Sequence, residues 1–161
     1  MSKHLSELLH SIPLDVLSRC GEGDPFIHQI VQDSRQVAQG DLFVANMGGS
    51  VDGHAYIPKA IENGAVAIIG SRPADGFEQL SVPYLQMAEP RYAMAHLAAA
   101  VYDFPARKMV VIGVTGTDGK TTTSNIIYQI LKRAGYKAGI ISTVNAVIGD
   151  EVIDTGFHVT T

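Results

Sequence analysis

Apolar and polar positions alternate along the first two thirds of the chain in a pattern that predicts short strands and helices. Four apolar residues near the N-terminus recur at helical spacing: Leu5, Leu8, Leu9 and Ile12. Apolar runs bounded by turn-forming residues predict strands at 27–32, 42–46, 65–69 and 82–87. Amphipathic stretches with a proline in the first turn predict helices at 56–63 and 90–104. This alternation predicts a small α/β domain, which we place at residues 1–106.

The last third of the chain begins the same pattern again. Residues 108–114 form an apolar, β-branched run that is typical of a strand covered on both faces. Residues 120–134 have helical spacing, and residues 138–143 form a further apolar run. Together they predict one right-handed, parallel βαβ unit. Five apolar residues are expected to share one face of its helix: Ile126, Ile127, Ile130, Leu131 and Ala134.

A hairpin is predicted after this unit, because Gly149 and Asp150 separate two apolar runs at 144–148 and 151–153. One crossover helix cannot cover both faces of a parallel sheet, so the second domain, at 107–161, is expected to be only the beginning of a larger one. We therefore expect the chain to be the front part of a longer protein. We also expect its second part to be disordered, rearranged or paired with another chain, because its apolar sheet surface is uncovered.

Composition and charge narrow the class of protein. The 161 residues are 46% hydrophobic and 17% charged, which favours a folded, soluble domain. A net charge of −4 without any cluster of Lys and Arg argues against a nucleic-acid partner. No apolar run is long enough to span a membrane, and the single cysteine, Cys20, excludes an intrachain disulfide. The expected protein is cytoplasmic, and its oligomeric state is left open.

The sequence TGTDGKTTT, at residues 115–123, lies between a predicted strand and a predicted helix. It is the segment whose residues most clearly indicate a chemical function, namely phosphate binding. Its glycines allow backbone N–H groups to converge on phosphate oxygens at the positive end of the helix. Lys120 adds a charge for the β- and γ-phosphates, and the Thr121 hydroxyl is placed to ligate Mg²⁺. The predicted ATP-binding residues are Gly116, Thr117, Asp118, Gly119, Lys120, Thr121 and Thr122.

This loop is a variant of the phosphate-binding pattern GxxxxGK[ST], because Val114 stands at its first position, with glycines at 113 and 116 instead. The alternative interpretation is a glycine-rich turn between strand and helix with a surface lysine. The β-branched run before the loop and the amphipathic helix behind it favour the phosphate-binding interpretation.

The loop, together with the segment DSRQVAQGDLFVANMGGSVDGHAYIPKAIENGAVAII, resembles the Mur ligase family. The resemblance covers residues 31–69 and 108–161 well, while residues 70–107 match only in layout. It implies a UDP-binding N-terminal domain followed by an ATP-binding domain. Asp118 departs from the family, which usually has Asn there. A carboxylate at this position should repel a triphosphate unless a cation screens it.

The resemblance also implies substrate contacts. Ser34 matches the family serine that contacts the uridine nucleotide, whereas Asp33-Ser34-Arg35 read without the family is a turn that ends a strand. Gly49, Ser50 and Val51 match a short loop against the uracil and diphosphate. Thr160 and Thr161 match a Thr-Thr pair that contacts the muramoyl group. In the loop, Lys120 is the expected catalytic residue and Thr121 the expected metal ligand.

Within the family, the likeness is greatest to ligases that add the third amino acid to UDP-N-acetylmuramoyl-L-alanyl-D-glutamate. Such enzymes phosphorylate the dipeptide carboxylate with ATP and Mg²⁺, and the amine of the amino acid then attacks the acyl phosphate. The added amino acid is left open between meso-diaminopimelate, L-lysine and L-ornithine. The chain alone is expected to be inactive. The alternatives are a non-catalytic nucleotide-binding module and another ligase of the family, such as the enzyme that adds D-Ala-D-Ala.

Overall fold

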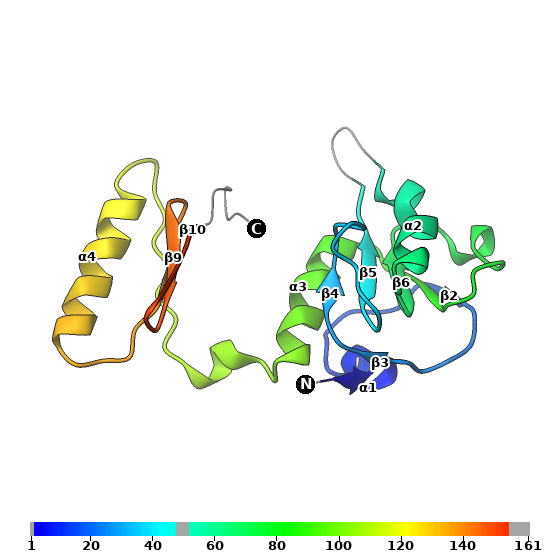
Figure 1. The fold of residues 1–161 in the computed structure, drawn as a ribbon, viewed down its shortest axis with the longest axis horizontal. Coiled ribbons are helices and arrows are strands. Elements are labelled where there is room, and N and C mark those ends of the chain that lie inside the picture. The colour runs from blue at the N-terminus through cyan, green and yellow to red at the C-terminus, as the bar shows by residue number, and fades with distance from the viewer. Residues whose placement is uncertain (1, 48–51, 155–161) are drawn as a thin grey trace. The chain divides into compact units, whose positions relative to one another are not determined.

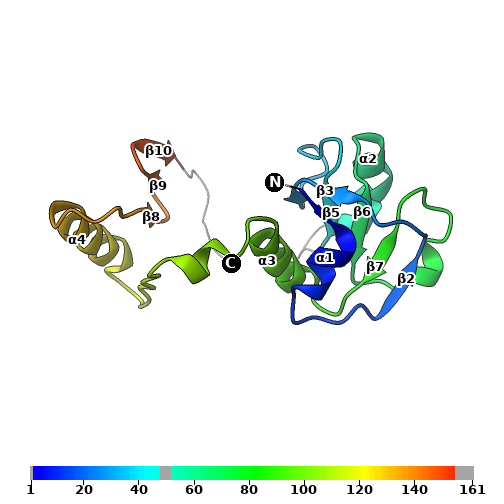
Figure 2. The ribbon, with the colours of Figure 1, turned by 90° about the horizontal axis from the view of Figure 1, so that it is seen from below.

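A computed structural model describes residues 2–47 and 52–154 of the chain. The chain divides into two compact units after Val110, close to the boundary expected at residues 106 and 107. Figures 1 and 2 show the elements of each unit. We describe each unit by itself.

The first unit is built on a five-stranded sheet with the strand order β2-β7-β6-β5-β4. Its strands are β2 (Ser18–Cys20), β4 (Ile30–Val31), β5 (Leu42–Ala45), β6 (Ala67–Gly70) and β7 (Tyr84–Gln86). The pairs β4–β5, β5–β6 and β6–β7 are parallel, and only β2 pairs in the antiparallel direction. This confirms the expected α/β fold with a parallel sheet.

Helices cover both faces of this sheet, as its sequence requires. Every residue of β5 and β6 is buried. Leu42 and Val44 of β5 pack with α1 (Leu5–His10) and α3 (Pro90–Val101) on one face. Phe43 of β5 packs with α2 (Ile57–Glu62) on the other face. Because successive side chains of a strand point to opposite faces, a continuous apolar strand requires this three-layer arrangement.

The helices at the N-terminus, at 56–63 and at 90–104 are confirmed, with small differences at their ends. The chain enters α2 through a 3-10 turn, η1 (Gly53–Tyr56), and Pro58 lies in the first turn of the helix. The predicted strand at 27–32 is instead two short strands, β3 (Phe26–Ile27) and β4. The break occurs because β3 pairs with β1 (Lys3–His4) and β4 pairs with β5. The remaining 3-10 turns are η2 (Ala74–Gly76) and η3 (Pro105–Lys108).

The second unit contains one helix and one small sheet. The helix α4 (Lys120–Arg133) confirms the prediction for residues 120–134. The sheet has the order β8-β9-β10, with β8 (Ile140–Ile141), β9 (Asn145–Ile148) and β10 (Glu151–Asp154), and both pairings are antiparallel. The predicted hairpin is confirmed, because Ile148 pairs with Glu151 across the turn and Gly149 has a φ of +63°.

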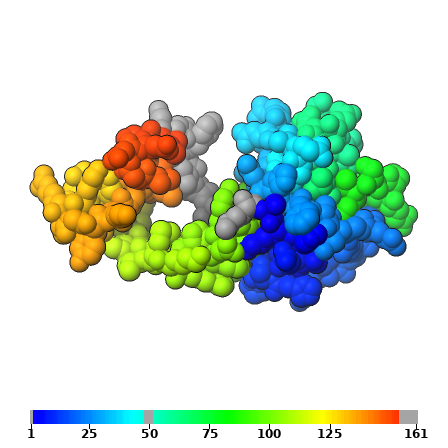
Figure 3. Space-filling model, turned by 60° about the horizontal axis from the view of Figure 1, so that its bottom comes forward, coloured from blue at the N-terminus to red at the C-terminus, as the bar shows by residue number. Residues whose placement is uncertain are grey.

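The predicted strand at 108–114 was wrong. Residues 109–114 belong to no strand among those that the structure describes, so the parallel βαβ unit does not form. Val110 is 91% exposed and Val111 is 69% exposed, and the surface of this yellow-green segment is visible in Figure 3. A buried parallel strand needs neighbours on both edges and layers on both faces, and the described residues of this unit supply neither. The described part of this unit is therefore arranged differently from the predicted βαβ unit.

Candidate functional site

The predicted ATP loop of the second unit leads directly into α4. Gly119, the residue before the helix, has a φ of +74°, a left-handed conformation that glycine adopts without steric cost. The first helical hydrogen bond runs from the N–H of Thr123 to the carbonyl of Gly119 at 2.9 Å. The N–H groups of residues 120–122 therefore have no acceptor within the helix and form its positive end. A phosphate group would find donors at this position.

Lys120 folds back over this loop. Its Nζ donates to the carbonyl oxygens of Gly116 at 2.5 Å and Thr117 at 3.1 Å. The Lys120 ammonium therefore lies beside the loop residues that are expected to bind phosphate. Because these two acceptors are exposed carbonyls, a phosphate could replace them as partners of the ammonium.

The neighbouring polar residues of the loop are open to solvent. Thr117, Asp118 and Thr122 are exposed, and Thr121 is half-buried. The Asn125 side-chain amide donates to the Thr121 carbonyl at 2.8 Å, and no side-chain hydrogen bond in the described part of the chain engages the Thr121 hydroxyl, which leaves the hydroxyl able to bind a cation. Within the described residues, no ion pair screens the Asp118 carboxylate.

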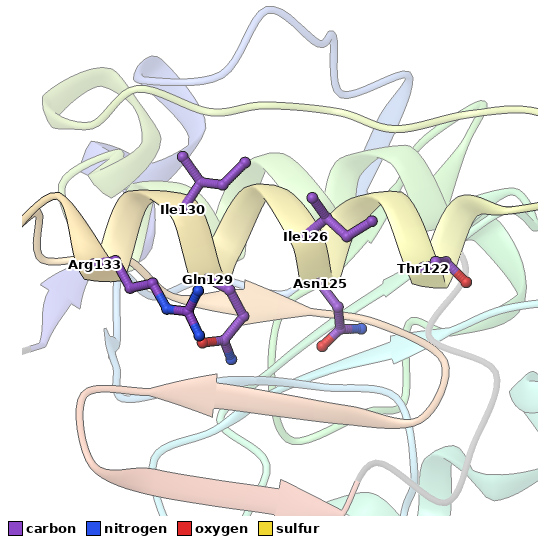
Figure 4. A pocket seen from close by; sticks show the side chains of 6 residues that line it. All are labelled: Thr122, Asn125, Ile126, Gln129, Ile130 and Arg133. Carbon is purple, nitrogen blue, oxygen red and sulfur yellow. The ribbon is translucent and has the colours of Figure 1, made fainter.

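A shallow hollow of about 360 Å³ follows one face of α4 (Figure 4). It is lined by Thr122, Asn125, Ile126, Gln129, Ile130 and Arg133. Ile126 is 55% exposed and Ile130 is 60% exposed, and both belong to the apolar face that the sequence predicts for this helix. The hollow is therefore an uncovered packing face of the helix, and we assign no ligand to it.

The first unit contains a larger hollow of about 540 Å³ at the carboxyl ends of β4 and β5. Its lining comes from the turn after β4, the end of β5, the turn η1 and the beginning of α3: Gln32, Asp33, Ser34, Arg35, Phe43, Asn46, Gly53, Tyr56 and Arg91. In open α/β sheets, ligands bind outside the carboxyl ends of the parallel strands. We call this hollow the strand-end pocket.

Ser34 lines the strand-end pocket and is only 7% exposed. Its carbonyl accepts a hydrogen bond from the Asn63 side chain at 2.7 Å, which holds the turn against the end of α2. No described hydrogen bond involves its hydroxyl, and no fully buried side-chain polar atom in the described part of the chain lacks a partner. The hydroxyl therefore keeps access to the pocket.

The residues on either side of Ser34 form a tight turn. The Arg35 guanidinium donates to both carboxylate oxygens of Asp33, at 2.9 Å and 2.7 Å, and the Arg35 N–H donates at 3.0 Å. The Arg35 side chain and then its backbone N–H lower the pKa of Asp33 to about 2. The turn that the sequence suggests is thus present, and it places Ser34 in the pocket.

A cluster of polar side chains surrounds the buried His54 of η1. The imidazole of His54, whose side chain is 2% exposed, lies 2.7 Å from Asp52 through Nδ1. Its Nε2 accepts the Ser71 N–H at 3.2 Å, so Nδ1 carries the proton and donates to Asp52. Arg72 also pairs with Asp52, and the His54 backbone and imidazole hold the pKa of that carboxyl below its usual range. This cluster joins η1 to the end of β6.

The structure describes only some of the site residues that the sequence predicts. Ser34 lies in the first unit and the predicted ATP loop in the second, and each has the local surroundings described above. Gly49, Ser50, Val51, Thr160 and Thr161 lie outside the described residues. Sequence reasoning did not single out six pocket residues: Gln32, Phe43, Asn46, Gly53, Tyr56 and Arg91. Gln32 and Asn46 end predicted strands, which was a usable signal.

Comparison with known proteins assigns the chain to a family. Residues 26–102 match the family described as "Mur ligase family, catalytic domain", and residues 114–161 match the "Mur ligase middle domain". The chain belongs to the Mur ligase family, as the sequence motifs indicate.

Individual relatives agree with this assignment. The chain is 44% identical over 151 residues to the UDP-N-acetylmuramyl-tripeptide synthetase of Roseiflexus sp., covering 93% of this chain and 28% of that protein. It is 46% identical over 128 residues to the UDP-N-acetylmuramoyl-L-alanyl-D-glutamate–2,6-diaminopimelate ligase of Geobacillus thermodenitrificans, covering 80% of this chain and 25% of that protein.

A solved structure adds a nucleotide-bound example. The MurF ligase of Thermotoga maritima, in complex with ADP, matches with a TM-score of 0.53 and 36% identity over 65% of this chain and 23% of that chain. The chain thus spans less than a third of the length of these three proteins. In residues 2–47 and 52–154, no helix has the length and apolar character needed to cross a membrane.

Proposed function

We propose that the chain is the N-terminal portion of a cytoplasmic, ATP-dependent ligase of peptidoglycan precursor synthesis. Residues 1–106 bind the UDP end of the substrate, and residues 107–161 begin the ATP-binding domain. The proposed reaction adds the third amino acid to UDP-N-acetylmuramoyl-L-alanyl-D-glutamate. The observation that carries the proposal is the loop before α4, where Lys120 and three N–H groups without helical acceptors lie together.

The loop supplies positioning and charge for phosphoryl transfer. The N–H groups of residues 120–122 and the Lys120 ammonium hold the phosphates of ATP. The Thr121 hydroxyl fits Mg²⁺, which prefers oxygen ligands and neutralises charge on the β- and γ-phosphates. Transfer of the γ-phosphoryl group to the dipeptide carboxylate yields ADP and an acyl phosphate. The amino acid amine then attacks its carbonyl carbon, forms the amide and releases inorganic phosphate.

The strand-end pocket is the proposed site for the UDP end of the substrate. Ser34 offers its hydroxyl there, as the family resemblance implies. Gly49, Ser50 and Val51 remain predicted contacts of the uracil and diphosphate, and Thr160 and Thr161 remain predicted contacts of the muramoyl group.

A second candidate function is the addition of D-Ala-D-Ala to the corresponding tripeptide precursor. The 36% identity to the MurF ligase favours this candidate. The higher identities, 44% and 46%, are to a tripeptide synthetase and a diaminopimelate ligase, and they favour addition of the third residue.

Isothermal titration of the full chain tests the proposal. We expect heat of binding with UDP-N-acetylmuramoyl-L-alanyl-D-glutamate at millimolar concentration, and weaker binding of the tripeptide precursor. Absence of heat with either ligand would contradict the proposal, and preference for the tripeptide would favour the second candidate. In a parallel titration with Mg·ATP, Lys120→Ala should weaken binding about tenfold or more, whereas Lys137→Ala, another exposed lysine, should not.

A further inference from the structure

The strand-end pocket contains two arginines in different electrostatic states. Arg35 is held by both oxygens of the Asp33 carboxylate, so this pair adds no net charge to the pocket. Arg91 takes part in none of the ion pairs or side-chain hydrogen bonds found among the described residues. The positive charge of Arg91 is therefore the only one in the described lining that no carboxylate compensates.

The position of Arg91 strengthens this effect. Arg91 is the second residue of α3, a helix of 12 residues, and follows Pro90, which has no N–H. The first backbone bond of the helix runs from the Ala93 N–H to the Glu89 carbonyl at 3.0 Å. The N–H groups of Arg91 and Tyr92 have no acceptor within the helix and add partial positive charge. Glu89 makes no cap with its side chain and does not line the pocket.

The rest of the lining is uncharged and suited to hydrogen bonding. The buried Ser34 hydroxyl opens into the pocket, and the Asn46 side-chain amide lies beside that of Gln32 at 3.4 Å. Tyr56 is 46% exposed and offers an aromatic surface. Amide and hydroxyl groups can pair with the polar edge of a base, and an aromatic ring can stack on its face. The pocket thus combines one uncompensated positive charge with uncharged hydrogen-bonding and aromatic groups. A ligand that joins a base to an anion matches this combination.

We infer that Arg91 neutralises the diphosphate of the UDP-linked substrate, whereas Arg35 and Asp33 only fix the turn that presents Ser34. This inference rests on the proposed function and names a binding residue that the sequence motifs do not include. A guanidinium can donate two parallel hydrogen bonds to a phosphate, which suits a diphosphate better than a single ammonium does.

Titration of the full chain with UDP and with uridine tests this role. In Arg91→Gln, we expect the affinity for UDP to fall about 10-fold or more, and the affinity for uridine to stay within about twofold of the parent chain. Arg91→Lys keeps the positive charge but loses the paired donors of the guanidinium. The affinity of this variant for UDP should therefore lie between that of the parent chain and that of Arg91→Gln. The Arg91 side chain is exposed, so its replacement should leave the thermal midpoint of the chain unchanged.

Arg19→Gln is the matched control. It removes the same charge from β2, at the opposite edge of the sheet from β4, where the Arg19 guanidinium donates to the Gly23 carbonyl. Its affinity for UDP should equal that of the parent chain. If Arg91→Gln binds UDP as tightly as the parent does, the inference is wrong while the proposed function stands. If the parent binds neither UDP nor uridine, both the proposed function and the inference fail.

Discussion

Gly70, at the end of β6, lies where two buried side chains leave no room for a methyl group. A Cβ at this position would lie 2.5 Å from Nε2 of His54 and closer still to the Tyr84 hydroxyl. Tyr84 donates to the Arg72 carbonyl at 2.8 Å, and His54 accepts from the Ser71 N–H, so neither side chain can retreat without losing a partner. The absence of a side chain at position 70 thus allows η1 to pack against the sheet.

We therefore expect Gly70→Ala to lower the free energy of unfolding by about 1–3 kcal/mol. Gly76→Ala is the control, because a Cβ there would meet nothing within 4 Å. Urea unfolding followed by circular dichroism measures both variants. Equal stability of the two would mean that the cluster around His54 can rearrange freely.

The Asp33 carboxylate provides a prediction about pH. Hydrogen bonds from Arg35 lower its pKa from the usual value near 3.8 to about 2. A carboxyl whose pKa is lower in the folded state stabilises the fold above its unfolded pKa, and this contribution is lost as the pH falls from about 4 to about 2. In a carbon NMR titration, Asp33 should titrate near pH 2, and Arg35→Gln should move its midpoint upward. An unchanged midpoint would contradict the ion pair.

At the scale of elements, α3 and α4 have similar apolar spacing but different surroundings. Leu97 in α3 is fully buried between helix and sheet, whereas Ile126 in α4 is 55% exposed. We expect Leu97→Ala to lower the free energy of unfolding by about 2–5 kcal/mol and Ile126→Ala to change it by less than about 0.5 kcal/mol. Urea unfolding of both variants gives the comparison. A cost at Ile126 as large as that at Leu97 would show that α4 has a packing partner.

The sequence predicted those elements whose signals are local. Pro58 and Pro90 mark helix beginnings, and Gly149 with Asp150 marks the hairpin turn, because each signal depends only on backbone geometry nearby. The segment 108–114 has the composition of a strand, but a parallel strand forms only with neighbours that are distant in sequence. The three-residue strand β2 is too short to show a pattern of its own.

The site was predicted to a similar extent, and for the same reason. The loop before α4 is continuous in sequence, so its lysine and glycines could be proposed as phosphate-binding residues from their spacing. The strand-end pocket is assembled from four separate segments, and Arg91 enters it from a helix that begins far along the chain from Ser34. Only the sheet topology brings these residues together. Ser34 was predicted through family resemblance and not through its burial.

At the scale of the whole molecule, the two units are joined through an exposed segment that contains basic residues. Arg107 and Lys108 end η3 and are exposed, and residues 109–114 follow in no strand. We expect brief treatment with trypsin to cut first after these two residues, since proteases attack exposed segments with few packing contacts. Mass spectrometry would identify the product that ends at residue 107 or 108. First cleavage after Lys59, within α2, would contradict this division of the chain.

The exposed apolar residues that begin the second unit, Val111 and Ile112, also affect how the polypeptide behaves in solution. Because sulfate and similar salts strengthen the burial of apolar surface, precipitation should begin at a lower ammonium sulfate concentration than for the first unit alone. A fluorescent dye that reports apolar surface should brighten in the presence of the full chain, and the excised first unit should lack most of that signal. Purification at low ionic strength and low protein concentration would then keep the chain from aggregating.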